Sequence, residues 1–244
     1  MAIWVGTSGY NYPEWRGSFY PEKFSTAKML SYYAERFSTV EINYTFYRMP
    51  NAKTMAAWDT GTPAGFAFAL KASRRITHDA RLKDVDESVR YFVDTARTLG
   101  PKLGPLLFQL PPYFKKDLGR LEDVLVLLPP GLRCVFEFRH DSWFGEDVYE
   151  RLRARNAALC IADTDKGTTP AVLTADFGYF RLRDEGYSKE NLMQWSETVT
   201  KLGIGLRDTY VYFKHEESGI GPALAQQFAA LMSASPSRQR KSEA

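Results

Sequence analysis

Residues 39–46 read TVEINYTF, a run in which bulky apolar side chains alternate with polar ones. Successive side chains of a β-strand point to opposite faces, so Glu41, Asn43 and Thr45 share one face of this predicted strand. Three further runs alternate in the same way, and their polar faces bear Lys71, Glu137, Arg139, Arg181 and Arg183. The sequence therefore predicts strands with one apolar face and one face that carries charged groups.

Eight apolar or β-branched runs follow one another along the chain. They are Ile3–Val5, Thr39–Phe46, Phe66–Ala72, Leu103–Leu110, Cys134–Phe138, Leu159–Ala162, Tyr179–Leu182 and Tyr210–Phe213. Segments with helical spacing lie between them, and such alternation is typical of a parallel sheet. Eight strand–helix units in 244 residues predict an α/β fold, the (β/α)8 TIM barrel. An open doubly wound sheet is the alternative, but no GxGxxG motif follows the first run.

The predicted helices have apolar residues three and four positions apart. They cover Met29–Phe37, Asn51–Asp59, Val89–Leu99, Leu118–Leu128, Asp147–Arg155, Leu192–Leu202 and Leu224–Leu231. Asp84, with Glu87 three residues later, predicts the start of the third helix. The segment between the sixth and seventh strands is the least helical. We predict a single barrel domain over residues 1–232 and a mobile polar tail over residues 233–244.

The composition is typical of a folded, water-soluble protein, with 44% hydrophobic and 25% charged residues. The 32 Lys and Arg exceed the 29 Asp and Glu by three, which is too few for a dedicated nucleic-acid or membrane-surface binder. Cys134 and Cys160 lie in apolar runs without disulfide or metal-ligand spacing, which predicts reduced core cysteines in a cytoplasmic protein. We see no signal peptide and no apolar run near the roughly 18 residues of a membrane span, and expect no membrane partner.

In a barrel wrapped by helices, the apolar face of each strand meets the helices and the polar face points into the lumen. Eight polar side chains are predicted there: Glu41, Lys71, Gln109, Glu137, Arg139, Asp163, Arg181 and Arg183. Four cations outnumber three carboxylates in this set, and buried charges need partners. Two interpretations stay open: a structural ion-pair network, or a polar functional centre whose surplus charge a bound anion balances.

Several motifs resemble those of a known family. They are Gly6-Thr7-Ser8-Gly9-Tyr10 continuing to Tyr12, Trp15 and Phe19-Tyr20-Pro21; Thr39-Val40-Glu41-Ile42-Asn43; Lys71 with Ile76-Thr77-His78; Gly104-Pro105-Leu106-Leu107-Phe108-Gln109-Leu110-Pro111; and Glu137-Phe138-Arg139-His140 with Ser142-Trp143-Phe144. In this order, over nearly the whole chain, they resemble the YecE-like family, a domain of unknown function (DUF72). The resemblance implies a TIM barrel and brings no established reaction.

The chain departs from that family after the last predicted strand. Many members resemble Val-Tyr-Phe-Asn-Asn there, and this chain has Lys214 and His215 in place of the two amides. A substrate contact made by those amides would be altered here.

The candidate catalytic residues are Glu41, Glu137, Asp163 and Lys71. Carboxyl groups in different environments have different pKa values and can act as general acid and general base without a metal, and Glu41 and Glu137 are the preferred pair. Lys71 would be able to form a Schiff base if desolvated, whereas pairing with a carboxylate is the more common state of such a lysine.

Metal binding by histidines is not expected. His78, His140 and His215 are widely spaced and fit no zinc motif. We therefore predict no cofactor, with a divalent cation held by Glu41, Glu137 and Asp163 as the alternative.

Cationic and aromatic residues near the strand ends are candidate ligand-binding groups. A GIGP turn at residues 219–222 would present backbone amides to a phosphate, although such a turn is also an ordinary helix start. Aromatic residues of the first loop would stack on sugars or bases, or would instead bury one another. The predicted binding set is Tyr10, Trp15, Asn43, Gln109, Arg139, His140, Arg181, Arg183, Lys214, His215, Gly219 and Gly221.

Three classes of function remain open. The preferred one is an enzyme, a hydrolase or an isomerase or lyase, that acts on a phosphorylated or otherwise anionic small molecule such as a sugar. A nucleic-acid binder or phosphodiesterase would use the same arginines and an aromatic rim. A non-catalytic binding or regulatory protein is the third. The sequence identifies neither the substrate nor the oligomeric state.

Overall fold

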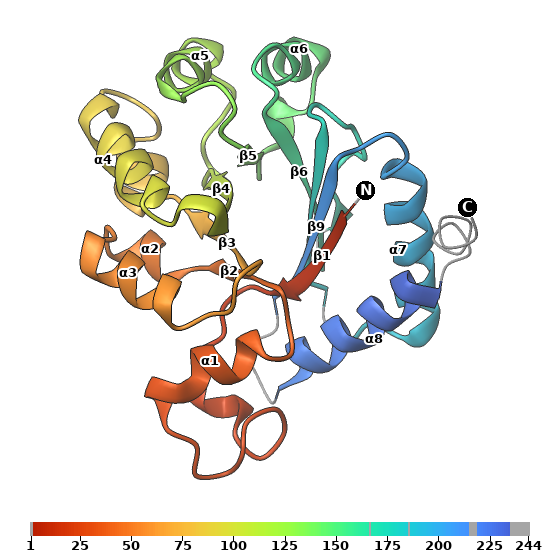
Figure 1. Ribbon diagram of the computed structural model, residues 1–244. Coiled ribbons are helices and arrows are strands. Elements are labelled where there is room, and N and C mark those ends of the chain that lie inside the picture. The colour runs from red at the N-terminus through yellow and green to blue at the C-terminus, as the bar shows by residue number, and fades with distance from the viewer. Residues whose placement is uncertain (1, 166, 185, 215–218, 235–244) are drawn as a thin grey trace, which may run out of the picture.

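The computed structural model shows a barrel of parallel strands surrounded by helices (Figure 1). It describes residues 2–165, 167–184, 186–214 and 219–234. Eight strands follow one another around the barrel in the order β1-β9-β8-β6-β5-β4-β3-β2. They are β1 (Ala2–Thr7), β2 (Thr39–Ile42), β3 (Ala67–Lys71), β4 (Leu103–Gln109), β5 (Cys134–Glu137), β6 (Ala158–Thr164), β8 (Phe177–Leu182) and β9 (Asp208–Phe213). A two-residue strand, β7 (Gly167–Thr168), pairs antiparallel with β6. The predicted TIM barrel is thus confirmed.

The barrel closes where β1 meets β2. The two strands are joined by an isolated parallel bridge between Ser8 and Glu41, and the Gly9 amide donates a hydrogen bond of 2.7 Å to the Glu41 carbonyl. Gly6 permits this approach, because a Cβ at that position would lie 2.2 Å from the Thr39 carbonyl oxygen. Closure therefore depends on a position without a side chain.

Helices cover the outside of the barrel (Figure 1). They are α1 (Met29–Ala34), α2 (Tyr44–Tyr47), α3 (Ala52–Thr60), α4 (Asp86–Arg97), α5 (Leu118–Leu127), α6 (Glu146–Ala154), α7 (Lys189–Leu202) and α8 (Ile220–Ala234). Short 3-10 turns lie at Pro13–Trp15, Thr26–Lys28, Gly100–Lys102 and Asp141–Trp143, and a π-helical turn at Arg75–Asp79. In the described part of the segment between β6 and β8 there is no helix, as the weak pattern there predicts.

Three predicted boundaries are wrong. The strand predicted over residues 39–46 ends at Ile42, and the chain turns into α2 at Tyr44. The α4 helix begins at Asp86 instead of near Asp84, because Asp84 has a left-handed φ of 52° that a helix N-terminus does not accept. The α8 helix continues to Ala234, two residues into the predicted tail. Residues 235–244 lie outside the described part of the chain.

The alternation of side chains divides the core into two layers. Val40, Phe68 and Phe136 belong to the large apolar cluster between the strands and the helices. Small and aromatic side chains fill the lumen instead, among them Ala69, Val135, Cys160, Tyr179 and Tyr212. The prediction that apolar faces meet the helices is therefore confirmed.

Aromatic rings fill the half of the lumen nearer the amino ends of the strands. Trp4 stacks on Tyr210 with ring centroids 5.9 Å apart. Phe177 and Tyr179 pack against the same Tyr210 ring, and Tyr179 also contacts Tyr212. This aromatic plug leaves the opposite half of the lumen to the polar groups.

Both cysteines are free and buried, as predicted. Among the helices of the described residues, none has the length and apolar character that crossing a membrane requires.

Candidate active site at the barrel mouth

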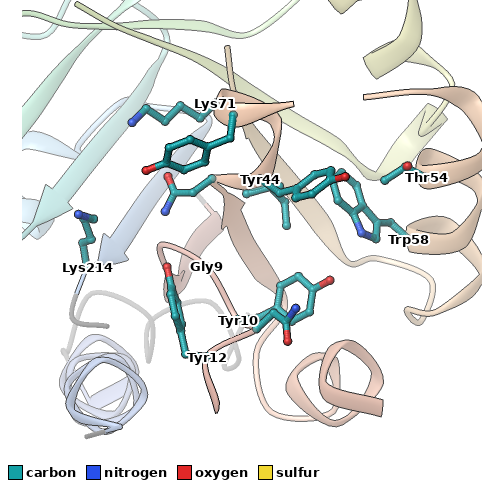
Figure 2. Close-up of a pocket in the computed structure, with 12 residues that line it drawn as sticks. Gly9, Tyr10, Tyr12, Tyr44, Thr54, Trp58, Lys71 and Lys214 are labelled. Carbon is teal, nitrogen blue, oxygen red and sulfur yellow. The ribbon is translucent and has the colours of Figure 1, made fainter. Parts of the chain in front are cut away.

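A cavity of about 470 Å³ lies over the carboxyl ends of β1, β2, β3 and β9. It is lined by Gly9, Tyr10, Asn11, Tyr12, Ile42, Asn43, Tyr44, Tyr47, Thr54, Trp58, Lys71 and Lys214 (Figure 2). This is the face of a TIM barrel on which active sites form. The volume is in the range of small-molecule binding sites.

Five of the twelve residues that line the cavity are aromatic. Tyr10 and Tyr12 come from the loop after β1, Tyr44 and Tyr47 from α2, and Trp58 from α3. Tyr44 packs edge-on against Trp58 with ring centroids 6.5 Å apart. Such walls suit the flat, weakly polar face of a sugar or another ring.

The Lys71 amine is the unusual group of this cavity. Lys71 is the last residue of β3, its side chain is 9% exposed, and its Nζ lies 4.0 Å from the centroid of the Phe46 ring. None of the ion pairs between described residues includes Lys71, so the carboxylate-paired state expected as more common is not found within this part of the chain. Burial, followed by the positive charge of Arg181, lowers the pKa of Lys71 to about 7. Near neutral pH a large fraction of this amine is therefore unprotonated.

An ion-pair network centred on Arg181 lies beneath the cavity. Arg181 crosses the lumen from β8 and donates to Glu41 of β2 at 2.8 Å and to Glu137 of β5. Arg183 donates to Glu137 at 3.2 Å, and the Gln109 amide donates to the same carboxylate at 2.8 Å. Arg181, Glu41 and Glu137 are each at most 1% exposed, and both terminal nitrogens of the buried guanidinium donate to carboxylates, while its Nε has no hydrogen-bond partner among the described residues.

Hydroxyl groups complete the surroundings of Glu41. The Ser8 hydroxyl and the Tyr179 hydroxyl both donate to its carboxylate, the latter at 2.6 Å. The Asn43 amide donates to the Ser8 Oγ at 2.9 Å, which links the network to the cavity wall. The lumen positions predicted for Glu41, Lys71, Gln109, Glu137 and Arg181 are thus confirmed.

The network keeps both carboxylates ionised. Burial alone would raise the pKa of Glu41, but the charge of Arg181 and the hydrogen bonds from Ser8 and Tyr179 lower it below its usual range. Burial also raises the pKa of Glu137, but the charges of Arg181 and Arg183 outweigh this effect and lower the pKa to about 2. Neither group is suited to exchange a proton at neutral pH.

The charges of the described lumen residues do not cancel when Lys71 is protonated. Lys71, Arg181 and Arg183 then face Glu41 and Glu137, which leaves one surplus positive charge. Loss of the Lys71 proton removes that surplus, and a bound anion would offset it instead. An excess of positive charge agrees with the expectation from the sequence. The lumen set differs from the predicted one, because Arg139 and Asp163 do not belong to it.

Asp163 does not face the lumen, and its predicted place in the catalytic set is wrong. On β6, Cys160 and Ala162 point inward, so Asp163 points toward the helices. Its carboxylate accepts hydrogen bonds from Tyr187 at 2.7 Å and from the Trp195 indole of α7 at 3.1 Å. These contacts give Asp163 a structural role under α7.

Arg139 also lies outside the lumen, contrary to the prediction. The β5 strand ends at Glu137, and the Arg139 side chain is exposed. Burial is the main cause that lowers the pKa of Arg183 and of His78. The charge of Arg139 lowers both further, after that of Arg181 at Arg183 and that of Lys71 at His78. Arg139 therefore adds positive charge to the edge of the barrel mouth.

The three carboxylates considered as ligands of a divalent cation do not converge. Glu41 and Glu137 both hold Arg181, and Asp163 lies on the other side of the barrel wall. Within the described ranges, no other cluster of three or more His, Cys, Asp or Glu side chains is placed to hold a metal ion.

The aromatic residues of the first loop divide into two groups. Tyr10 and Tyr12 line the cavity, and their contact with a ligand stays a prediction. Trp15 is completely buried against Tyr12, Phe19 and Tyr20, so it has no surface to offer a ligand and its predicted binding role is wrong. For Trp15 the alternative, a small core beneath the loop, is the correct one.

The remaining predicted binding residues have structural contacts. The His140 Nδ1 accepts a hydrogen bond from the Ser142 amide at the start of a 3-10 turn. Gly219 has a φ of 71° and lies so close to Ser18 that a Cβ would be 2.1 Å from its Oγ, so the glycine serves loop packing. Gly221 is buried in the first turn of α8. His215 lies outside the described residues.

Sequence patterns did not identify several residues of the site. Tyr44, Thr54 and Trp58 line the cavity from α2 and α3, and Phe46 supplies the ring under the Lys71 amine. The alternation in residues 39–46 obscured α2, because its apolar positions also fit a continued strand. Trp58 belongs to a correctly predicted helix, but nothing in the sequence indicates which end of that helix meets the barrel mouth.

Comparison with known proteins identifies relatives over the whole fold. Residues 4–244 match the family described as "Protein of unknown function DUF72". The UPF0759 protein YunF of Bacillus subtilis is 26% identical over 257 aligned positions, which cover 89% of this chain and 90% of YunF. The UPF0759 protein YecE of Escherichia coli K12 is 29% identical over 150 positions, 61% of this chain and 53% of YecE.

A solved structure shares the same architecture. The crystal structure of TM1631, a DUF72 family protein from Thermotoga maritima, superposes with a TM-score of 0.83 and 28% identity. The match covers 96% of this chain and all of that one. The names of these relatives state no activity.

Proposed function

Since the chain belongs to the DUF72 family, which has no established function, we propose from the site itself that it is an enzyme acting on a small anionic molecule, with Lys71 as its proton-transferring group. The observation that supports this most strongly is the buried Lys71 amine, which lies on a cavity wall without a carboxylate partner among the described residues. With a pKa of about 7, this amine can both accept and release a proton near neutral pH.

The buried carboxylates have a different part in this proposal. Glu41 and Glu137 fix Arg181 under the cavity, and Arg181 in turn disfavours the protonated form of Lys71. They act as positioning residues for the charge beneath the amine. The proton transfer predicted for them is assigned to Lys71 instead.

An anionic substrate fits the charges around the cavity. Lys214 lines the cavity together with Lys71, and its charge further lowers the pKa of Lys71. Exposed Arg139 lies at the mouth, and the Nε of Arg183 is buried with no hydrogen-bond acceptor among the described residues. A phosphate or carboxylate group would offset this positive charge.

The nucleic-acid alternative has less support. The Arg181 guanidinium is buried and already paired, so no phosphate of a polynucleotide reaches it. Trp15 offers no stacking surface. A cytoplasmic location is part of the same proposal, and the two free, buried cysteines agree with it.

Titration calorimetry with phosphorylated sugars, small carboxylates and short oligonucleotides tests the proposal. An anion bound near Lys71 favours its ammonium form, so binding at about pH 7.5 is expected to take up a fraction of a proton. Buffers with different ionisation enthalpies measure this uptake. It is expected to disappear in Lys71→Met and to persist in the surface control Lys201→Met.

Two outcomes would contradict the proposal. One is that no small anion binds while oligonucleotides do, which would favour the nucleic-acid function. The other is that proton uptake is unchanged in Lys71→Met, which would remove Lys71 from the reaction.

A further inference from the structure

We infer that Lys71 acts as a nucleophile that forms an imine with small carbonyl compounds bearing a phosphate or carboxylate group. This inference rests on the proposed function, because it names the substrate class of the same cavity. It adds a covalent step that proton transfer alone does not require.

The position of the amine suits attack on a carbonyl carbon. Lys71 is the last residue of β3. Its side chain points to the lumen face, as does that of the small residue Ala69 two positions earlier. The amine lies over the ring of Phe46. Lys71 also borders the cavity, as Figure 2 shows. A ligand in the cavity can therefore contact the Lys71 nitrogen directly. No ion pair with a described residue has to break first.

The charged groups around the amine keep its lone pair available. Arg181 and Lys214 disfavour the ammonium form, while Glu137 and Glu41 oppose them from within the Arg181 network. His78, whose ring packs edge-on against Phe46, has its pKa lowered to about 4 by burial and by the charges of Lys71 and Arg139. It stays neutral and adds no competing charge.

The covalent step is balanced in atoms and charge. The Nζ lone pair attacks the carbonyl carbon, and the carbonyl π electrons move to the oxygen. Transfer of a proton from nitrogen to that oxygen gives a carbinolamine. A further proton from solvent in the open cavity lets the oxygen leave as water, and the carbon–nitrogen double bond forms as a protonated imine. No oxidant or reductant is needed.

The product of this step is stabilised where it forms. The protonated imine carries its positive charge on the nitrogen that lies 4.0 Å from the centroid of the Phe46 ring, a cation–π arrangement. The aromatic wall of Tyr44 and Trp58 accommodates the carbon skeleton.

The anionic group of the ligand is assigned to the side of the cavity that holds Lys214. Figure 2 shows the side chains of Lys71, the last residue of β3, and Lys214, which directly follows β9, at the same cavity. A short ligand can thus place its carbonyl carbon at Lys71 and its anionic end toward Lys214. This arrangement selects anionic carbonyl compounds over neutral ones.

Reductive trapping tests the inference on the intact protein. Wild type is incubated with glycolaldehyde phosphate, with glyoxylate or with neutral glycolaldehyde in the presence of cyanoborohydride, and the modified lysine is identified by peptide mass spectrometry. At about pH 7.5, Lys71 is expected to be trapped about tenfold or more faster than any other lysine, because more of it is unprotonated. The two anionic aldehydes are expected to react faster than glycolaldehyde, and Lys214→Met to remove that preference.

The variant Lys71→Arg keeps a cation but cannot form an imine, so its trapping is expected to fall to the level of the surface lysines. Trapping spread evenly over surface lysines of wild type would overturn the inference. Calorimetry with 2-hydroxyethyl phosphate, which has no carbonyl, separates the two proposals. If it binds with Lys71-dependent proton uptake and yet no imine is trapped at Lys71, the imine is wrong and the proposed function stands. If it does not bind and no imine is trapped, both are contradicted.

Discussion

At the scale of single residues, Lys71 stores an electrostatic cost in the folded protein. The unfolded chain binds a proton at this lysine up to its ordinary pKa of 10.5, whereas the folded protein releases it near pH 7. Between these values the unfolded state binds more protons, so the free energy of unfolding rises with pH. The contribution has a slope of up to about 1.4 kcal/mol per pH unit.

We therefore expect the unfolding free energy of wild type, minus that of Lys71→Met, to rise from about pH 7 toward pH 10, so that a deficit of wild type at low pH becomes smaller. Urea denaturation at a series of pH values measures it. Below about pH 6 the two curves are expected to run parallel, since the amine is then protonated in both states. Parallel curves over the entire range would mean that Lys71 titrates normally.

The residue scale also shows how far the alternation of side chains is informative. It correctly placed Glu41, Lys71, Glu137 and Arg181, because each alternates with large apolar residues that can only face the helices. It also places Asp163 toward the helices, on the face of large Leu159 and Ile161, so the lumen position predicted for Asp163 followed its charge and not the alternation. Side-chain size, and not polarity, decides which face of a strand fits a narrow lumen.

At the scale of elements, the meeting of β1 and β2 is the most constrained contact of the barrel. A methyl group at Gly6 would collide with the Thr39 carbonyl and lie 3.0 Å from the Tyr33 hydroxyl. Both are fixed by β2 and by the hydrogen bond from Tyr33 to Thr39, so neither can move easily.

Gly6→Ala is expected to lower the free energy of unfolding by about 3 kcal/mol, near the upper end of the cost of overpacking. Gly119→Ala in α5 is the matched control, because its added methyl group meets only the Asp117 carboxylate at 3.6 Å. In a helix this change is expected to be neutral or slightly stabilising. Equal thermal stability of the two variants would show that β1 and β2 separate without cost.

The elements were more predictable than the cavity they build. Eight strands and the order of the helices follow from local patterns of apolar residues, which each element needs in order to bury a face. The wall made by Tyr44 and Trp58 depends on how α2 and α3 pack over the mouth. That packing joins residues far apart in sequence and leaves no local pattern.

At the scale of the whole molecule, one continuous sheet connects the first strand to the last. Red β1 lies beside blue β9 in Figure 1, so neither end of the barrel can be removed without opening it. A closed barrel of this kind is expected to unfold as one unit, and the prediction of a single domain can be tested in this way.

We expect one cooperative thermal transition, with equal calorimetric and van't Hoff enthalpies. Differential scanning calorimetry of wild type measures both. Gly6→Ala is expected to shift this transition to lower temperature as a single peak. Two resolved transitions in wild type would contradict a single folding unit.

The aromatic plug in the lumen limits how a ligand can enter and leave the cavity. Trp4, Phe177, Tyr179 and Tyr210 block the amino-terminal half of the barrel, so the cavity has no rear exit. A molecule that enters the cavity from the barrel mouth must therefore leave by the same side. If the protein is the enzyme proposed above, reactant and product share one opening, and a molecule that covers this opening would block the reaction without contacting Lys71.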